Sequence, residues 1–115
     1  MKKVFVSIPM TGKSELEIMR TFDRIKKLVD IKYCGEEVAF VNDIHAPTAD
    51  NTRDALINIG NSISKLADAD LVVFSDLFQL SKGCVVEYAC CNEYNIPYIF
   101  ECKLLDEVLE NVQYK

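Results

Sequence analysis

Short apolar stretches alternate four times with longer segments whose apolar residues recur at helical spacing, and this alternation constrains the fold most. We expect strands at residues 4–8, 37–41, 70–74 and 97–100. We expect helices at residues 15–32, 52–66, 84–93 and 104–112. Strands that alternate with helices form a parallel sheet with right-handed crossovers and helices on both faces. The sequence therefore predicts a single three-layer α/β/α domain over residues 1–115. Its sheet should be parallel and four- to five-stranded, in a flavodoxin- or Rossmann-like arrangement.

The apolar spacing also predicts which helix faces point into the core. In the first helix this face comprises Ile18, Phe22, Ile25 and Val29. In the second it comprises Leu56, Ile59, Ile63 and Leu66, and in the last Leu105, Val108, Leu109 and Val112. Ser14, with Glu17 three residues later, is typical of a capping box at the start of the first helix, and Gly35 is a plausible stop signal after it.

The charge balance excludes some classes of partner. Thirteen basic residues face eighteen acidic ones, for a net charge of −5, and the acidic residues are scattered along the chain. A protein that binds a nucleic acid polymer is expected to carry a basic stripe, which this sequence lacks. No stretch approaches the ~18 apolar residues that a membrane span needs, and the apolar start lacks a signal-peptide cleavage site. We therefore expect a cytoplasmic protein with neither a membrane nor a nucleic acid polymer as its partner.

The cysteines favour buried thiols over metal ligands or disulfides. There are five of them, Cys90 and Cys91 are adjacent, and no C-x-x-C pair occurs. His45 is the only histidine. We therefore expect five free thiols and no metal site. Cys84 differs from the others because it is expected to open a helix, where a thiolate is favoured.

In parallel α/β sheets, ligands bind outside the carboxyl ends of the strands. Three loops meet that description: residues 9–14, 42–51 and 75–83. We expect these loops, and the helix starts that follow them, to carry the functional residues.

Glu87 is the most informative residue near these loops. It falls close to the start of the helix that follows the third strand, among apolar neighbours. One interpretation is that its carboxylate complements the positive end of the helix dipole, as it does in many helices. The other is that it is a functional carboxylate, kept ionised with help from the same dipole.

Two stretches of the chain resemble the nucleoside 2-deoxyribosyltransferase family, particularly the small members found in bacterial and phage genomes. The first is the opening, Val4-Phe5-Val6-Ser7-Ile8-Pro9-Met10-Thr11-Gly12. The second is the third strand together with Ser81-Lys82-Gly83-Cys84-Val85-Val86-Glu87-Tyr88-Ala89. The order of strands and helices matches over nearly the whole chain.

The resemblance implies that Glu87 is a catalytic nucleophile. It would attack C1′ of a 2′-deoxyribonucleoside, or of its 5′-monophosphate, and expel the base. A glycosyl-enzyme ester would form, as in a retaining glycosidase, and water or a second base would then take the sugar. No metal and no organic cofactor is implied. The partner is a small-molecule nucleoside or nucleotide.

The chain departs from the family at three positions. The family's acid, which assists the departing base, falls on Ser62, eight residues before Asp70. Serine is no comparable acid near neutral pH, and Asp68 and Asp70 are expected at the wrong end of their strand. The family's strand-one tyrosine is matched by Phe5, which lacks the hydroxyl. Ser81 stands where the transferases carry an aspartate and where a nucleotide-hydrolysing branch of the family carries a serine. A serine hydroxyl at this position suits contact with a phosphate or sugar oxygen. The alternative is that Ser81 caps the following helix.

The remaining candidates come from the three loops and the motifs beside them. Lys13 and Ser14 follow the first strand and are candidate phosphate ligands at a helix N-terminus. Phe78 is placed to stack on a base or to pack on a partner subunit. The other residues that we expect to contact substrate are Ser7, Met10, Gly12, Asn42, Asp43 and Gly83.

Two rival functions remain open. The Phe5 and Ser62 departures also fit a catalytically diverged protein of the same fold that binds a nucleotide derivative. A second rival is an interaction module with a vestigial pocket. Members of the family are commonly homo-oligomers in which a neighbour completes the site, so the resemblance implies a dimer or higher assembly.

Overall fold

The computed structural model describes residues 1–42 and 50–113 and contains four strands, four α-helices and one 3₁₀ helix in that part of the chain. The strands are β1 (Lys2–Ser7), β2 (Val38–Phe40), β3 (Leu71–Phe74) and β4 (Tyr98–Phe100). The helices are α1 (Glu15–Lys32), α2 (Thr52–Leu66), η1 (Phe78–Leu80), α3 (Lys82–Glu93) and α4 (Glu101–Gln113).

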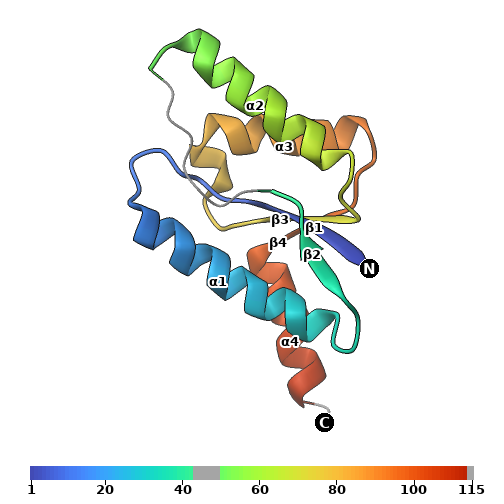
Figure 1. Cartoon of the computed structure of the whole chain (residues 1–115). Coiled ribbons are helices and arrows are strands. Elements are labelled where there is room, and N and C mark those ends of the chain that lie inside the picture. The colour runs from blue at the N-terminus through green and yellow to red at the C-terminus, as the bar shows by residue number, and fades with distance from the viewer. Residues whose placement is uncertain (43–49, 114–115) are drawn as a thin grey trace.

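The strands form one parallel sheet in the order β2-β1-β3-β4. Val4 of β1 is paired with Phe40 on one side and with Leu71 on the other. Figure 1 shows α1 and α4 on one face of the sheet and α2 and α3 on the other. The three-layer α/β/α prediction is therefore confirmed, with four strands.

Each face of the sheet has its own core because successive strand residues point to opposite faces. On the α1 and α4 side, Val4, Val6 and Ile8 pack with Ile25, Val29, Leu71, Val73, Leu104 and Val108. On the α2 and α3 side, Phe5 packs with Leu66, Val72, Phe74, Phe78, Cys84 and Cys91. This alternation decides on which side of β1 each of its side chains can act.

The predicted start and stop signals of α1 are confirmed. Ser14 caps the helix, and its Oγ accepts a hydrogen bond from the backbone N–H of Glu17 at 3.2 Å. The helix ends at Lys32, and Gly35 follows with a φ of +89°, a conformation that glycine adopts without steric cost.

The predicted inward face holds for α1 and in part for α2 and α4. In α2, Ile59 and Ile63 are half-buried. In α2 only Leu66 is buried, and Leu56 is 63% exposed. In α4 Leu104 and Val108 are buried, whereas Leu105 and Leu109 are about half exposed, at 43% and 48%. In α4 the prediction is confirmed for Val108 and wrong for Leu105 and Leu109, because two adjacent apolar columns run along the helix and only packing decides which one faces the sheet. The side chain of Val112 lies outside the described residues.

Two helix boundaries also differ from the prediction. Helix α3 begins at Lys82 rather than at Cys84, because Ser81 supplies the cap. Helix α4 begins at Glu101, directly after β4, rather than at Leu104. The 3₁₀ turn η1 was not predicted, and it shortens the loop between β3 and α3.

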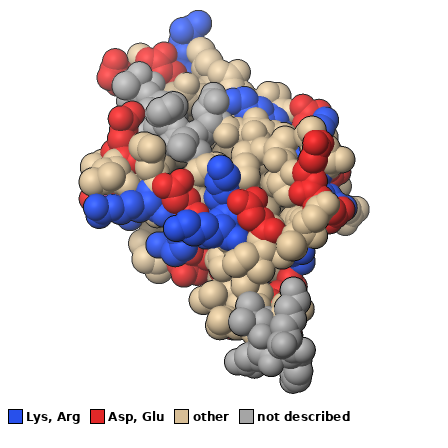
Figure 2. All heavy atoms as spheres, turned by 60° about the horizontal axis from the view of Figure 1, so that its bottom comes forward, with Lys and Arg blue, Asp and Glu red and all other residues tan. Residues whose placement is uncertain are grey.

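The surface carries interleaved charges. On the face that Figure 2 shows, Lys and Arg side chains alternate with Asp and Glu side chains rather than forming a basic stripe. None of the helices in residues 1–42 and 50–113 is long and apolar enough to cross a bilayer. All five cysteines are free, as predicted.

Candidate functional site

The carboxyl ends of β1 and β3 meet at the centre of the sheet, where the strand order changes direction. Ser7 is the last residue of β1, and Glu87 lies in the second turn of α3. The Ser7 hydroxyl donates a hydrogen bond of 2.8 Å to Oε1 of Glu87, and both residues are buried. The structure therefore brings together two predicted site residues that lie 80 positions apart in the chain.

Burial dominates the electrostatics of Glu87. Its exposed fraction is only 6%, and this desolvation raises the pKa of its carboxyl to about 7, although the Ser7 hydrogen bond lowers it. That the start of α3 helps to keep Glu87 ionised stays a prediction, and its effect is weaker than in the first turn. No acidic residue lies in the first turn of α3, so the carboxylate lies beyond the stretch where the helix dipole acts most strongly.

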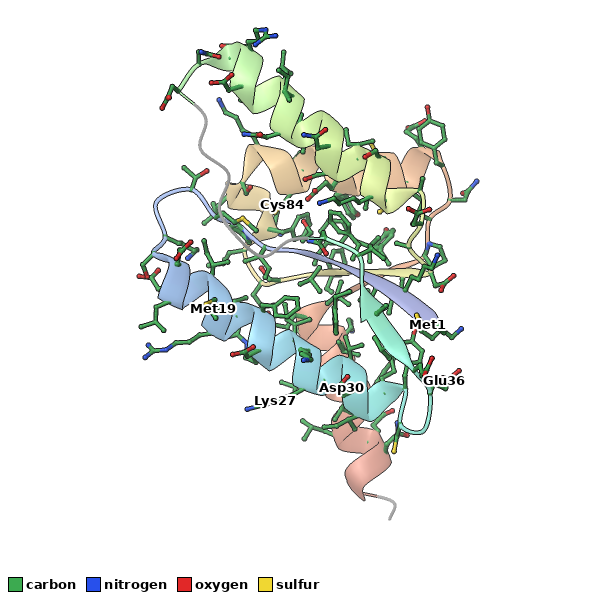
Figure 3. The ribbon with its side chains drawn as sticks, in the orientation of Figure 1. Met1, Met19, Lys27, Asp30, Glu36 and Cys84 are labelled. Carbon is green, nitrogen blue, oxygen red and sulfur yellow. The ribbon has the colours of Figure 1, made fainter. Side chains whose placement is uncertain are left out.

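Cys84 and Cys91 flank Glu87 on the inner face of α3. Burial raises the pKa of the Cys84 thiol, which the Ser7 and Ser81 hydroxyls partly counteract, and it raises the pKa of Cys91 to about 11. Figure 3 labels Cys84 at the start of α3, on the side of the sheet that α2 and α3 cover. The prediction that Cys84 favours the thiolate was therefore wrong. Burial of its side chain disfavours the charged form more than the helix start favours it.

A cavity of about 350 Å³ opens between the first loop, α1 and the segment after β3. Two predicted phosphate or sugar ligands, Ser81 and Lys13, lie on its wall, whereas Ser7 and Glu87 do not. Ser81 Oγ also accepts the Cys84 N–H at 3.4 Å, so the cap interpretation is confirmed. The walls are formed by Ile8, Pro9, Thr11, Lys13, Thr21, Arg24, Ser75, Asp76, Leu77, Leu80 and Ser81.

Sequence reasoning missed an ion pair at this cavity. The Arg24 guanidinium donates to the buried Glu101 carboxylate through Nε and through Nη2, the latter at 3.2 Å to Oε1. Glu101 Oε1 also accepts the backbone N–H of Asp76 at 3.3 Å. The pair joins residues 77 positions apart, so no local sequence pattern could have revealed it.

The first loop turns sharply at Gly12. The N–H of Lys13 donates to the Met10 carbonyl at 3.1 Å, and Gly12 has a φ of +77°, as a type II turn requires at its third position. Gly12 is exposed and Met10 is half-buried, and neither lines the cavity.

Gly83 faces Ile59 of α2, and a side chain at this position would fit at ordinary van der Waals distance. A Cβ at this position would lie 3.5 Å from Cδ1 of Ile59 and 3.9 Å from Oγ of Ser81. Ser62 lies three residues after Ile59, so it shares the face of α2 that meets α3, and it is half-buried.

Asn42 is engaged by the backbone of β1. Its Nδ2 donates to the Val6 carbonyl at 2.7 Å, and its Oδ1 accepts the Val6 N–H at 2.9 Å. The side chain thus extends the β2 edge of the sheet by one pair of bonds. Asp43, the other candidate in this loop, lies outside the described residues.

Phe5 lies on β1 without a hydroxyl, and Asp70 lies at the far end of the sheet, as the sequence indicated for both. Phe5 is 1% exposed in the α2 and α3 core and brings no hydroxyl to it. Asp70 Oδ2 accepts the N–H of Lys3 at 2.8 Å, at the opposite end of the sheet from Glu87. Asp70 is therefore too remote to assist chemistry at Glu87.

Phe78 packs within its own chain. It is 8% exposed and stacks on Phe100, with ring centroids 5.4 Å apart and ring planes at 14°. That it stacks on a base or packs on a partner subunit stays a prediction; within its own chain, η1 turns most of the ring into the core.

The described residues contain no group of three or more His, Cys, Asp or Glu side chains arranged to hold a metal ion. Comparison with protein-family models, with curated proteins and with solved structures found no match. Ser7 and Glu87 at the carboxyl end of β1, and the cavity that begins at Ile8, are therefore the features of this chain that point to a function.

Proposed function

We propose that the protein cleaves or transfers the N-glycosidic bond of a 2′-deoxyribonucleoside or its 5′-monophosphate, with Glu87 as the nucleophile. The observation that carries this proposal is the buried Ser7–Glu87 hydrogen bond at the carboxyl end of β1. A carboxyl group that is buried, has a raised pKa and lies where parallel sheets bind ligands is characteristic of a functional site.

In this mechanism, ionised Glu87 attacks C1′ through one carboxylate oxygen. The C1′–N bond breaks, and its electron pair leaves with the base, which takes a proton from solvent. Water or a second base then attacks C1′ of the ester and releases the Glu87 carboxylate. Ser62 cannot protonate the departing base, so this chain relies on leaving groups that depart readily.

The cavity supports a role for Ser81 in holding sugar or phosphate. Lys13 and Arg24 contribute positive charge to its wall, and Ser81 lines the same cavity. Asp76 and the partner carboxylate Glu101 offset part of that charge. A 5′-monophosphate gains from both cations and from the hydroxyl, and we therefore propose monophosphates as the preferred ligands.

A second candidate function is that of a diverged protein that binds a nucleotide derivative without chemistry. Phe5 favours it, because a buried phenylalanine brings no hydroxyl to the place of the family's strand-one tyrosine. The lack of an acid at Ser62 favours it as well.

We also propose a homo-oligomer. Leu77 and Leu80 on the cavity wall are 65% and 79% exposed, and a second copy that covers them would close the cavity. Light scattering on purified protein tests this, and a monomer at all concentrations would contradict it.

The direct experiment is to incubate the protein with matched pairs of deoxynucleosides and their 5′-monophosphates and to detect free base by mass spectrometry. Release of base, faster from the monophosphates, is the expected result. Micromolar binding by calorimetry without any base release would support the binding-protein alternative instead.

A further inference from the structure

Ser7 and Phe5 point to the same side of the sheet. Val4, Val6 and Ile8 belong to the core under α1 and α4, whereas Phe5 belongs to the core under α2 and α3. Because side chains alternate along a strand, Ser7 shares the face of Phe5, and it is likewise 1% exposed. The last inward position of β1 on this face is therefore a buried hydroxyl.

The Ser7 hydroxyl is a hydrogen-bond donor to the Glu87 carboxylate. Ser7 Oγ donates to Oε1 of Glu87 at 2.8 Å, and among the described residues no second donor to this carboxylate is found. A serine has a single O–H, so its proton is committed to one carboxylate oxygen. Oε2 is left as the oxygen available for a ligand.

We propose that Ser7 is the positioning residue of Glu87: its hydroxyl fixes the orientation of the carboxylate and supplies the donor that Phe5, on the same face of β1, does not carry. The catalytic meaning of this role rests on the proposed function of Glu87. The structural part, that Ser7 controls the ionisation and orientation of the carboxylate, holds without any turnover.

The surroundings of Glu87 make this donor important. A buried carboxylate loses its hydration and needs hydrogen bonds to stay ionised. The other titratable groups that interact with Glu87 are the thiols of Cys84 and Cys91 on its own helix, and burial keeps both of them neutral. Among the described residues, Ser7 alone favours the ionised form.

The experiment follows the Glu87 carboxyl by carbon-13 NMR in protein labelled at the glutamate carboxyl carbons, with Glu87→Gln to assign its signal. In the wild type the signal titrates with a pKa of about 7. In Ser7→Ala the pKa moves upward, because the hydrogen bond that favours the ionised form is lost. Ser75→Ala is the matched control, since Ser75 is also a buried serine but its hydroxyl donates to the Asp76 carbonyl, and it leaves the Glu87 titration unchanged.

Two further variants keep the test decisive. Ser7→Cys nearly preserves the side-chain volume and supplies only a weak S–H donor, so it gives the same upward movement even if Ser7→Ala does not fold. Adding Phe5→Tyr to Ser7→Ala returns a hydroxyl to the same face of β1, and the pKa moves back down. A double variant that titrates like Ser7→Ala overturns the statement that Ser7 supplies a donor which a hydroxyl at position 5 could also provide.

An unchanged Glu87 titration in both Ser7→Ala and Ser7→Cys overturns the proposal. Where the wild type turns over substrate, Ser7→Ala also lowers kcat with little change in KM, because the ligand-binding cavity is intact. If the titration moves as expected but the wild type releases no base from any substrate, the positioning role stands and the proposed function fails.

Discussion

The buried Glu101 carboxylate holds the Arg24 guanidinium and the Asp76 backbone N–H together, so that one side chain joins α1, the segment after β3 and the start of α4. This arrangement fixes one wall of the cavity. Glu101 is only 5% exposed, and this burial strengthens its ion pair and its hydrogen bond because water screens them less.

Glu101→Gln is expected to destabilise the protein by about 1.5–3 kcal/mol, the range for a hydrogen bond to a charged group. The control is Glu107→Gln, which removes the exposed Lys32–Glu107 pair and should cost less than about 1 kcal/mol. Urea unfolding measures both. Equal losses in the two variants would show that burial of Glu101 does not strengthen its interactions.

Glu87→Gln is expected to stabilise the protein at high pH. The folded-state pKa of Glu87 is raised from 4.5 to about 7, so the folded protein holds this proton more tightly than the unfolded chain does. Wild-type stability should therefore fall as the pH rises from 4.5 to about 7, by roughly 3 kcal/mol at about 1.36 kcal/mol per pKa unit. The amide of the Glu87→Gln variant does not titrate, so that variant should escape this loss.

Denaturant unfolding of wild type and Glu87→Gln across this pH range is the check. The two stabilities should diverge between about pH 4.5 and pH 7 and stay apart above it. A difference in stability between the two proteins that is the same at every pH would mean that the Glu87 carboxyl titrates normally. That result would contradict the claim that burial controls the ionisation of Glu87.

Leu77 is a strained residue on the cavity wall. Its φ is +63°, a left-handed conformation that costs a leucine about 1–2 kcal/mol, and its side chain is 65% exposed. Asparagine tolerates this conformation, as Asn95 already does in this chain at a φ of +56°. Leu77→Asn should therefore raise the free energy of unfolding by about 1 kcal/mol.

Leu80→Asn is the matched control, because Leu80 is 79% exposed and is not among the positive-φ residues. It should change stability by less than about 0.5 kcal/mol. A destabilised Leu77→Asn would indicate that the leucine side chain makes a contact, such as one with a second copy, that outweighs its strain.

The fold could be predicted largely from the sequence, and the site only in part. Strands and helices follow from local periodicity, and the Ser14 cap follows from a local pattern, so all of them could be predicted from the sequence. The ionisation of Glu87 was not, because it depends on burial in the folded chain and on the contact with Ser7, 80 positions away. Packing between segments far apart in the chain likewise decides whether Leu104 or Leu105 faces the sheet. The same packing brings Arg24 to Glu101.

Ser62→Asp tests whether a missing acid limits turnover. Ser62 lies on the face of α2 that meets α3, and an aspartate there would stand where the resemblance implies the acid. A general acid contributes typically ~10²–10⁴-fold, so ordinary deoxynucleosides should react faster by an amount approaching this range. Substrates with activated leaving groups should gain much less. Equal gains on both substrate classes would indicate an effect other than protonation of the base.

The central claim is that Glu87 bonds to C1′. The most direct measurement is intact-mass and peptide mass spectrometry after incubation with a deoxynucleoside that carries an activated leaving group. Glu93→Gln, at the exposed end of the same helix, is the control. We expect a deoxyribosyl adduct on the peptide that contains Glu87 in the wild type and in Glu93→Gln, and neither adduct nor base release in Glu87→Gln, with ligand affinity largely kept. Unchanged turnover in Glu87→Gln would contradict the account.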